Sequence, residues 1–227
     1  MFFDHGGTLT CQKKDSPQIV SEVLAESGYS FPLEQVRDAL VKADRYWEER
    51  YRPLPRGCRF SDSILEDLHK NLLGHLGLER GVDELAAKIV SEWHDRAGFV
   101  LHPDTLPCLE ALRQHGLPMG VITQTLWKED EFRHLHLRRE GIEHYFNLVL
   151  TTESIGYDKP DKRLYLKAID LAGHAPHEIM HVGDSYELDV KGAESAGLRA
   201  VLLIRGGKAI SYDCATIGSL TQLQEML

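Results

Sequence analysis

Four short apolar segments in the second half of the chain constrain its fold more than any other feature. Each is separated from the next by a stretch in which apolar residues recur at helical spacing. Short apolar runs that alternate with helices are typical of buried parallel strands in βαβ units. The segments are Pro118–Thr123, Phe146–Thr152, Ile179–Asp184 and Ala200–Arg205. They predict an α/β fold in which helices cover both faces of a parallel sheet.

Residues 16–99 have a different pattern, with four stretches of helical spacing and no convincing strand. Ser16 followed by Pro17 is typical of a helix start, with Ser16 as the N-cap. We therefore predict that an α-helical domain, residues 16–99, is inserted into an α/β core domain made of residues 1–15 and 100–227.

Composition excludes several classes of protein. The formal net charge is -9 over 227 residues, and no long basic run is present, so we expect no nucleic-acid partner. The apolar runs are too short to span a bilayer. The four cysteines are scattered, which predicts free thiols in a reducing compartment. We expect a cytoplasmic monomer or homodimer.

Polar side chains gather at the carboxyl ends of the predicted strands, where open α/β sheets bind ligands. Asp4 directly follows the apolar residues 1–3, which predict a further strand at the start of the chain. The other polar residues are Thr123, Gln124, Lys159, Asp184 and Asp189. Two carboxylates from separate strands can hold Mg²⁺, and a lysine offsets negative charge. A hydroxyl and backbone amides can hold phosphoryl oxygens, and a carboxylate can attack phosphorus.

Four segments occur in an order and spacing that identify a family. They are FFDHGGTL, GVITQT, GYDKPDKRLY and HVGDSYELDVKGAESAG. Over nearly its whole length the chain resembles the haloacid dehalogenase-like hydrolases. The resemblance implies a Rossmann-like core, an α-helical cap and Mg²⁺-dependent hydrolysis of a small phosphorylated metabolite through an aspartyl-phosphate.

The resemblance also implies a role for each residue. Asp4 would be the nucleophile and a metal ligand, Asp184 the second metal ligand, and Gly6 would lend its backbone carbonyl to the metal. Asp189 would support these ligands without contacting the metal itself. The catalytic set would be Asp4, Thr123 and Lys159, and the phosphate would be bound by His5, Gly6, Thr123, Gln124 and Lys159.

Gly6 departs from the family's phosphatases, which usually have a second aspartate at this position as the general acid–base. Losing such a group costs about 10²–10⁴ in rate. The departure leaves open a weakened phosphatase, a phosphate-binding pseudo-phosphatase, and a phosphonoacetaldehyde hydrolase-like enzyme that forms an imine on Lys42. His5 could replace the acid, although as the next residue we expect its side chain to point away from Asp4. The acidic GDSYELD segment is typical of a Mg²⁺ site and disfavours a metal-free dehalogenase.

Three histidines lie close together in the segment that follows Gln124. His134, His136 and His144 could suggest a metal site. We expect instead that they occupy a solvated helix face, away from the strand ends.

Overall fold

The structure is a computed structural model that describes residues 1–51, 62–125, 129–206 and 212–227. The chain divides into two compact units. One consists of Met1–Cys11 and Val100–Leu227, and the other of Gln12–Phe99.

The first unit is built on a parallel sheet of six strands in the order β5-β4-β1-β6-β7-β8. The strands are β1 (Phe2–Phe3), β4 (Gly120–Thr123), β5 (Leu148–Thr151), β6 (Met180–Gly183), β7 (Arg199–Leu203) and β8 (Ala215–Ile217). Each of the four predicted apolar segments contributes one strand, so the predicted α/β fold is confirmed. The sequence analysis missed β8, which has only three residues.

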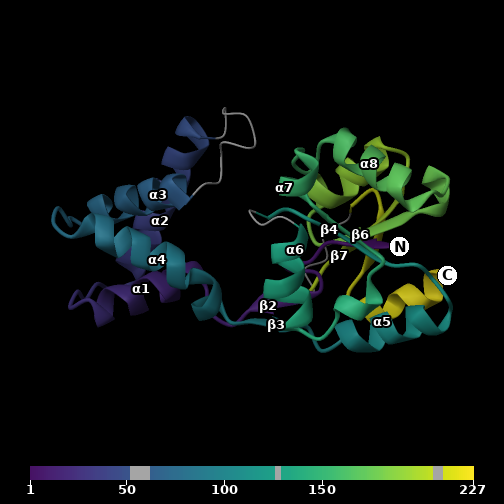
Figure 1. Cartoon of the computed structure of the whole chain (residues 1–227), viewed down its shortest axis with the longest axis horizontal. Coiled ribbons are helices and arrows are strands. Elements are labelled where there is room, and N and C mark those ends of the chain that lie inside the picture. Colours follow the sequence, from purple (N-terminus) through teal and green to yellow (C-terminus); the bar gives the residue numbers. More distant parts are fainter. Residues whose placement is uncertain (52–61, 126–128, 207–211) are drawn as a thin grey trace. The chain divides into compact units, whose positions relative to one another are not determined.

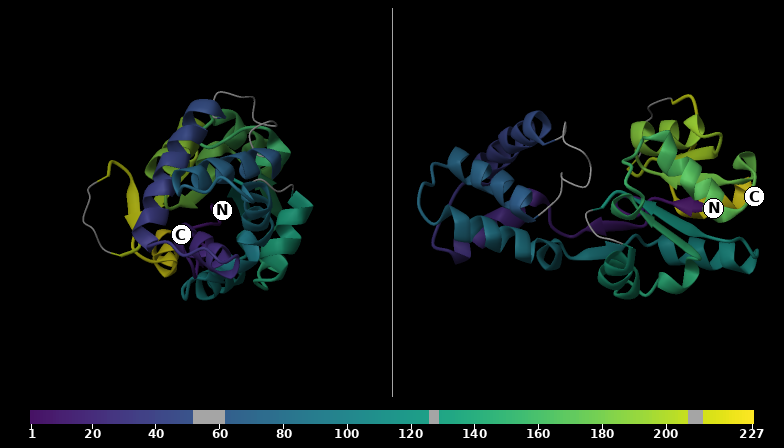
Figure 2. Two further views of the ribbon diagram at one scale, coloured as in Figure 1. Left: turned by 90° about the vertical axis from the view of Figure 1, so that its left-hand side faces the viewer. Right: turned by 45° about the horizontal axis from the view of Figure 1, so that its top comes forward.

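Helices lie on both sides of this sheet, with α5 on one side and α8 on the other (Figures 1 and 2). The helices are α5 (Thr105–Gln114), α6 (Glu129–Phe132), α7 (Thr152–Ile155), α8 (Lys162–Ala172) and α9 (Lys191–Ser195). Two π-helical turns, Arg133–Arg138 and Tyr186–Val190, continue α6 and precede α9. Short 3₁₀ helices form at Glu143–Tyr145, Pro176–Glu178 and Leu220–Met226.

The alternation of side chains along the strands produces two hydrophobic cores, one on each face of the sheet. Phe3 and Val121 are buried in the cluster that includes Leu109 of α5. Their neighbours Phe2 and Ile122 are buried in the cluster that includes Tyr165 of α8. The other members of the two clusters follow the same division, as with Val201 in the first and Leu202 in the second.

The second unit is helical. It contains α1 (Ser16–Glu26), α2 (Leu33–Arg50), α3 (Asp62–His75) and α4 (Val82–Ala97), which pack around their own apolar cluster. The N-cap of α1 is Asp15 and not Ser16 as expected, because the Asp15 side chain accepts from the backbone N–H of Gln18. Two short strands, β2 (Thr10–Gln12) and β3 (Phe99–Leu101), form a separate sheet where the chain passes between the units.

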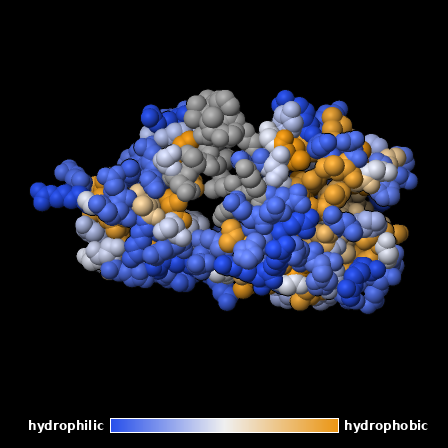
Figure 3. All heavy atoms as spheres, in the orientation of Figure 1, coloured by the Kyte–Doolittle hydropathy of each residue, from blue (hydrophilic) through white to orange (hydrophobic). Residues whose placement is uncertain are grey.

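The surface is mostly hydrophilic, with hydrophobic atoms visible over the α7–α8 part of the first unit (Figure 3), where Leu166 and Leu171 are exposed. Within the described residues, every helix is too short or too polar to cross a membrane.

Candidate active site

Asp4 is held at the carboxyl end of the central strand by the backbone. Its N–H donates to the carbonyl of Val182 on β6, at 2.8 Å. The turn that follows is closed by hydrogen bonds from the N–H groups of Leu9 and Thr10 to the carbonyl of His5, at 2.9 and 3.0 Å. These bonds fix the direction in which the chain leaves the strand, and therefore the position of the Asp4 carboxylate.

Lys159 joins two carboxylates that come from different strands. Its Nζ donates to Oδ1 of Asp4 at 2.7 Å and to Oδ1 of Asp189 at 2.6 Å. All three residues are buried. Burial alone would lower the pKa of Lys159, but Asp4 and Asp189 outweigh it and hold that pKa above its ordinary range. The ammonium group therefore stays charged, and it keeps two like charges close together.

Asp184 brings a third carboxylate to the same place. Oxygen atoms of Asp4, Asp184 and Asp189 all lie within 4.8 Å of one another. The pKa of Asp184 is raised to about 6, because its carboxyl group is partly desolvated and lies beside the negative charges of Asp4 and Asp189. Asp184 as a whole residue is nevertheless solvent-exposed, so water can reach the cluster of the three carboxylates. Mg²⁺ prefers such a set of ligands, since it binds oxygen and retains several water molecules.

Two glycines make this close approach possible. Gly7 has φ +82°, and a Cβ atom there would lie 2.2 Å from Oδ2 of Asp184. A Cβ atom on Gly183 would lie 2.1 Å from Cγ of Asp189. Any side chain at either position would displace a carboxylate, which explains the two glycines in physical terms.

Gly6 has a different environment from its neighbour. It is exposed, its backbone lies outside the left-handed region, and a Cβ atom there would meet no described atom within 4 Å. Neither the backbone nor packing among the described residues requires a glycine at this position.

His181 supports the site and was not predicted from the sequence. Its ring is buried, with Nε2 3.0 Å from Oδ1 of Asp189. The N–H of Ser185 donates to the other oxygen of Asp189 at 3.1 Å. Asp189 therefore has both oxygens engaged, and burial of its carboxyl group is outweighed by Lys159 and His181, which hold its pKa below the usual range. A histidine inside an otherwise apolar strand, as in IMHVGD, was the available signal.

The remaining residues of the predicted site come from β4. Thr123 is the last residue of this strand and is buried, whereas Gln124, directly after it, is exposed. Because β4 lies beside β1 in parallel register, with Phe3 opposite Val121, the carboxyl ends of both strands lie at the same edge of the sheet. Thr123 and Asp4 are thus brought to one edge.

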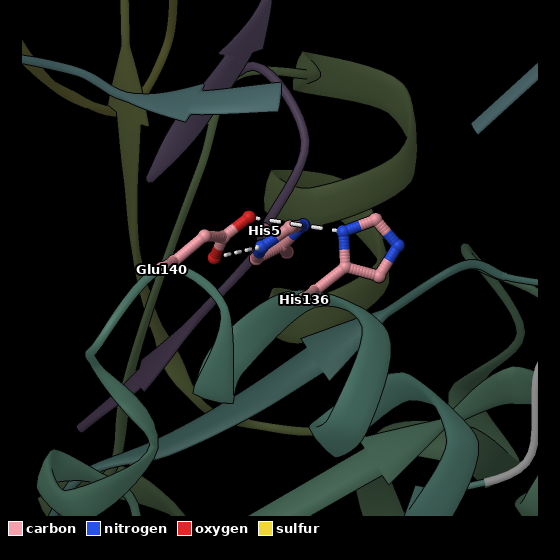
Figure 4. Close-up of side chains that lie close together, drawn as sticks. All are labelled: His5, His136 and Glu140. Atoms are coloured by element: carbon pink, nitrogen blue, oxygen red, sulfur yellow. Dashed lines mark hydrogen bonds and ion pairs between the residues drawn. The ribbon is translucent and has the colours of Figure 1, made fainter. Parts of the chain in front are cut away.

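His5 points toward the segment after β4 (Figure 4). Its Nε2 lies 3.0 Å from Oε2 of Glu140, and its ring meets those of Phe132 and His136 edge-on, with centroids 4.9 and 5.0 Å away. Burial raises the pKa of Glu140, but His136 and His5 outweigh burial and lower that pKa to about 2. With its ring engaged in this way, His5 is poorly placed to act as an acid at Asp4.

The expectation for the three histidines was wrong for one of them. His134 and His144 are exposed, as expected, but the side chain of His136 is only 3% exposed and contacts His5, the residue after Asp4. His136 lies four residues after the buried Phe132, on the same helical face, and this spacing turns its side chain inward.

Lys42 lies on α2 in the second unit, with its side chain exposed. Such a position is typical of a surface lysine and gives no support to an imine-forming role.

Comparisons with known proteins agree with this geometry. Residues 1–197 match the family model described as haloacid dehalogenase-like hydrolase. A glyceraldehyde 3-phosphate phosphatase from Methanopyrus kandleri is 31% identical over 192 residues, which cover 82% of this chain and 79% of the relative.

Two solved structures have similar folds. A 2-haloacid dehalogenase from Pseudomonas syringae pv. Tomato DC3000 has a TM-score of 0.67 and 26% identity, covering 99% of this chain and 95% of its own. The HAD-hydrolase YfnB from Bacillus subtilis, solved with bound magnesium, has a TM-score of 0.72 and 17% identity. The match covers 99% of this chain and 96% of the YfnB chain. The same fold therefore serves different reactions, and the residues of the site must decide between them.

Proposed function

The chain belongs to the haloacid dehalogenase-like hydrolases, and from this membership and the geometry around Asp4 we propose that it is a Mg²⁺-dependent phosphatase. Its substrate would be a small phosphorylated metabolite, the class to which the substrate named for the Methanopyrus kandleri relative belongs. The observation that carries the proposal is the ammonium group of Lys159, which bridges Asp4 and Asp189 while Asp184 adds a third carboxylate.

The proposed reaction has two steps at phosphorus. An oxygen of Asp4 bonds to phosphorus while the bond to the ester oxygen breaks, and the departing alcohol takes up a proton from water. Water then attacks phosphorus, loses a proton, and the bond to Asp4 breaks to release phosphate. Lys159 fixes the rotation of the Asp4 carboxylate, and Thr123 and Gln124 would hold phosphoryl oxygens at the end of β4.

The donor set around Asp4 fits Mg²⁺. The carboxylates of Asp4 and Asp184 and the backbone carbonyl of Gly6 would hold the ion, and Asp189 would keep Lys159 in place. When bound, Mg²⁺ supplies positive charge against the charge that develops on the transferring phosphoryl group. A metal-free dehalogenase would have no use for three carboxylates gathered within 4.8 Å at an open site, which supports the phosphatase over that alternative.

We further propose that residues 16–99 act as a helical cap that selects the substrate. Their four helices have a hydrophobic core of their own, so loops in this unit can vary without disturbing the sheet that holds Asp4.

A panel of phosphate monoesters tested with Mg²⁺ would examine the proposal directly. We expect hydrolysis that stops with EDTA and is abolished in Asp4→Asn. Asp170→Asn is a matched control, because Asp170 is an exposed carboxylate whose described ion pair is with Lys167 on the same helix. Its activity should equal that of the wild type.

Three results would contradict the proposal. They are full activity in Asp4→Asn, Mg²⁺ binding without turnover of any ester, and borohydride inactivation that needs an aldehyde substrate and Lys42. The second result would indicate a phosphate-binding pseudo-phosphatase, and the third a C–P bond hydrolase.

A further inference from the structure

The cluster of His5, His136 and Glu140 has the composition and geometry of a metal site that the proposed reaction does not use. We propose that it is a Zn²⁺ site, with both imidazoles and the carboxylate as ligands. The inference does not depend on the proposed phosphatase function, because it concerns different residues and a different ion.

The first support is the convergence of the three side chains (Figure 4). One ligand atom from each residue lies within 4.8 Å of the other two. Nε2 of His5 is 3.0 Å from Oε2 of Glu140, and Nδ1 of His136 is 3.7 Å from Oε1. Ligands of a tetrahedral Zn²⁺ ion, with bonds of about 2.0–2.2 Å, lie roughly 3.3–3.6 Å apart. Small side-chain movements would therefore bring these atoms around one ion.

The second support is that each imidazole faces a different oxygen of the carboxylate. A simple hydrogen bond explains the contact of His5 with Glu140. The second ring faces the other oxygen, Oε1, from 3.7 Å, a distance longer than a hydrogen bond. In the described part of the chain, Oε1 of Glu140 makes no hydrogen bond.

The third support is the way the protein encloses the cluster. The side chains of His5, His136 and Glu140 are 4%, 3% and 5% exposed, and Phe132 packs against both rings. His136 lies in the π-helical segment Arg133–Arg138, and Glu140 lies four residues later in the turn after it, with its N–H donating to the carbonyl of His136 at 2.9 Å. A spacing of four residues across one turn presents two ligands to one ion. Imidazole favours Zn²⁺ over Mg²⁺, which distinguishes this site from the all-oxygen group at Asp4.

A bound ion would join two loops of the first unit. His5 comes from the turn after β1, whereas His136 and Glu140 come from the segment between β4 and β5. Zn²⁺ would thus fasten the turn that begins at Asp4 to a neighbouring segment, and it would stabilise the folded state by mass action.

The test uses the full chain, stripped of metal with a chelator and dialysed into excess Mg²⁺ so that the carboxylates of the Asp4 site are occupied. Isothermal titration with Zn²⁺ should then show one ion per chain. His136→Ala and Glu140→Gln should each weaken this binding by at least about 10–100-fold, the loss seen when even an outer partner of a ligand is removed. His134→Ala and His144→Ala are matched controls on exposed histidines and should bind Zn²⁺ as the wild type does.

X-ray absorption on the wild type with Zn²⁺ gives a second readout that needs no variant. We expect nitrogen and oxygen ligands at about 2.0–2.2 Å with the scattering pattern of two imidazoles. The proposal is overturned if no Zn²⁺ is taken up, if uptake survives in folded Glu140→Gln, or if the absorption spectrum shows an oxygen-only shell. Loss of uptake in Asp184→Asn, with His136→Ala unaffected, would place the ion at the carboxylate site and also overturn it.

Discussion

Gly6→Asp should raise the activity of this protein on substrates with poor leaving groups. A carboxyl group at this position would protonate the departing alcohol and then activate water. The structure has room for it, because a Cβ atom on Gly6 meets no described atom within 4 Å and the backbone is not left-handed. The added Cβ atom therefore requires no rearrangement of described neighbours.

The size of the effect follows from general acid–base catalysis, which typically contributes 10²–10⁴ in rate. This corresponds to a barrier lower by about 3–5 kcal/mol. In the wild type, breaking the aspartyl-phosphate should be the slow step, so an aryl phosphate should give a burst of the free phenol followed by slow turnover. The gain in kcat/KM should appear on alkyl phosphates, which need the acid, and should be small on aryl phosphates.

Two control variants separate acid–base function from the effects of side-chain size and of a change in the neighbouring residue. Gly6→Asn has nearly the shape of the aspartate but no acid–base function, so it should give no gain. Gly7→Ala changes the next residue, where the added Cβ would lie 2.2 Å from Oδ2 of Asp184, and it should impair Mg²⁺ binding. The reasoning fails if Gly6→Asp folds, binds Mg²⁺ and still shows no advantage over Gly6→Asn on alkyl phosphates.

Three other perturbations test the site. Lys159→Met leaves the buried carboxylates of Asp4 and Asp189 without their shared cation, so urea unfolding should show a loss of about 3–5 kcal/mol; unchanged stability would contradict the bridging role. Because the pKa of Asp184 is raised to about 6, protons should compete with Mg²⁺ below that pH. Titrations from pH 8 to pH 5 should show Mg²⁺ affinity falling, whereas a flat profile would refute this. Because the pKa of Asp184 rises from about 3.9 in the unfolded chain to about 6 in the folded one, stability is lost as pH rises from about 4 to about 6. Metal-free Asp184→Asn should therefore melt higher than the wild type at pH 8, by a smaller margin at pH 5, and with little difference only near pH 3.

Much of the fold could be predicted because its signals are local. Apolar runs such as Ile179–Asp184 are too short for helices and end in polar residues, so both the strand and its functional end are visible in the sequence. Parallel strands then place Asp4, Thr123 and Asp184 at one edge without any knowledge of packing. The two-residue strand β1 was found because Asp4 follows it, whereas β8 has three residues and none of the site residues at its end, so it has too little pattern to be found this way.

The cluster around His5 could not be found by the same reasoning, because its burial depends on contacts between distant segments. His136 is one of three histidines close together, and composition alone suggests a solvated face for all of them. The distinguishing signal was the spacing of four from Phe132 to His136 and from His136 to Glu140, which extends a buried face. Similarly, Asp15 rather than Ser16 caps α1, because Gln18 completes a reciprocal pair of hydrogen bonds with it.

Among the described residues, Lys159 is the cation that pairs with the carboxylates at this site, and its charge has a consequence for the order of binding. Once Asp4, Asp184 and Asp189 are all ionised, Lys159 cancels one of their charges and leaves two negative charges. A phosphate monoester carries two more, so it should be repelled until a divalent ion has neutralised the site. Substrate and Mg²⁺ should therefore bind with positive cooperativity, and each should raise the affinity of the other by the same factor.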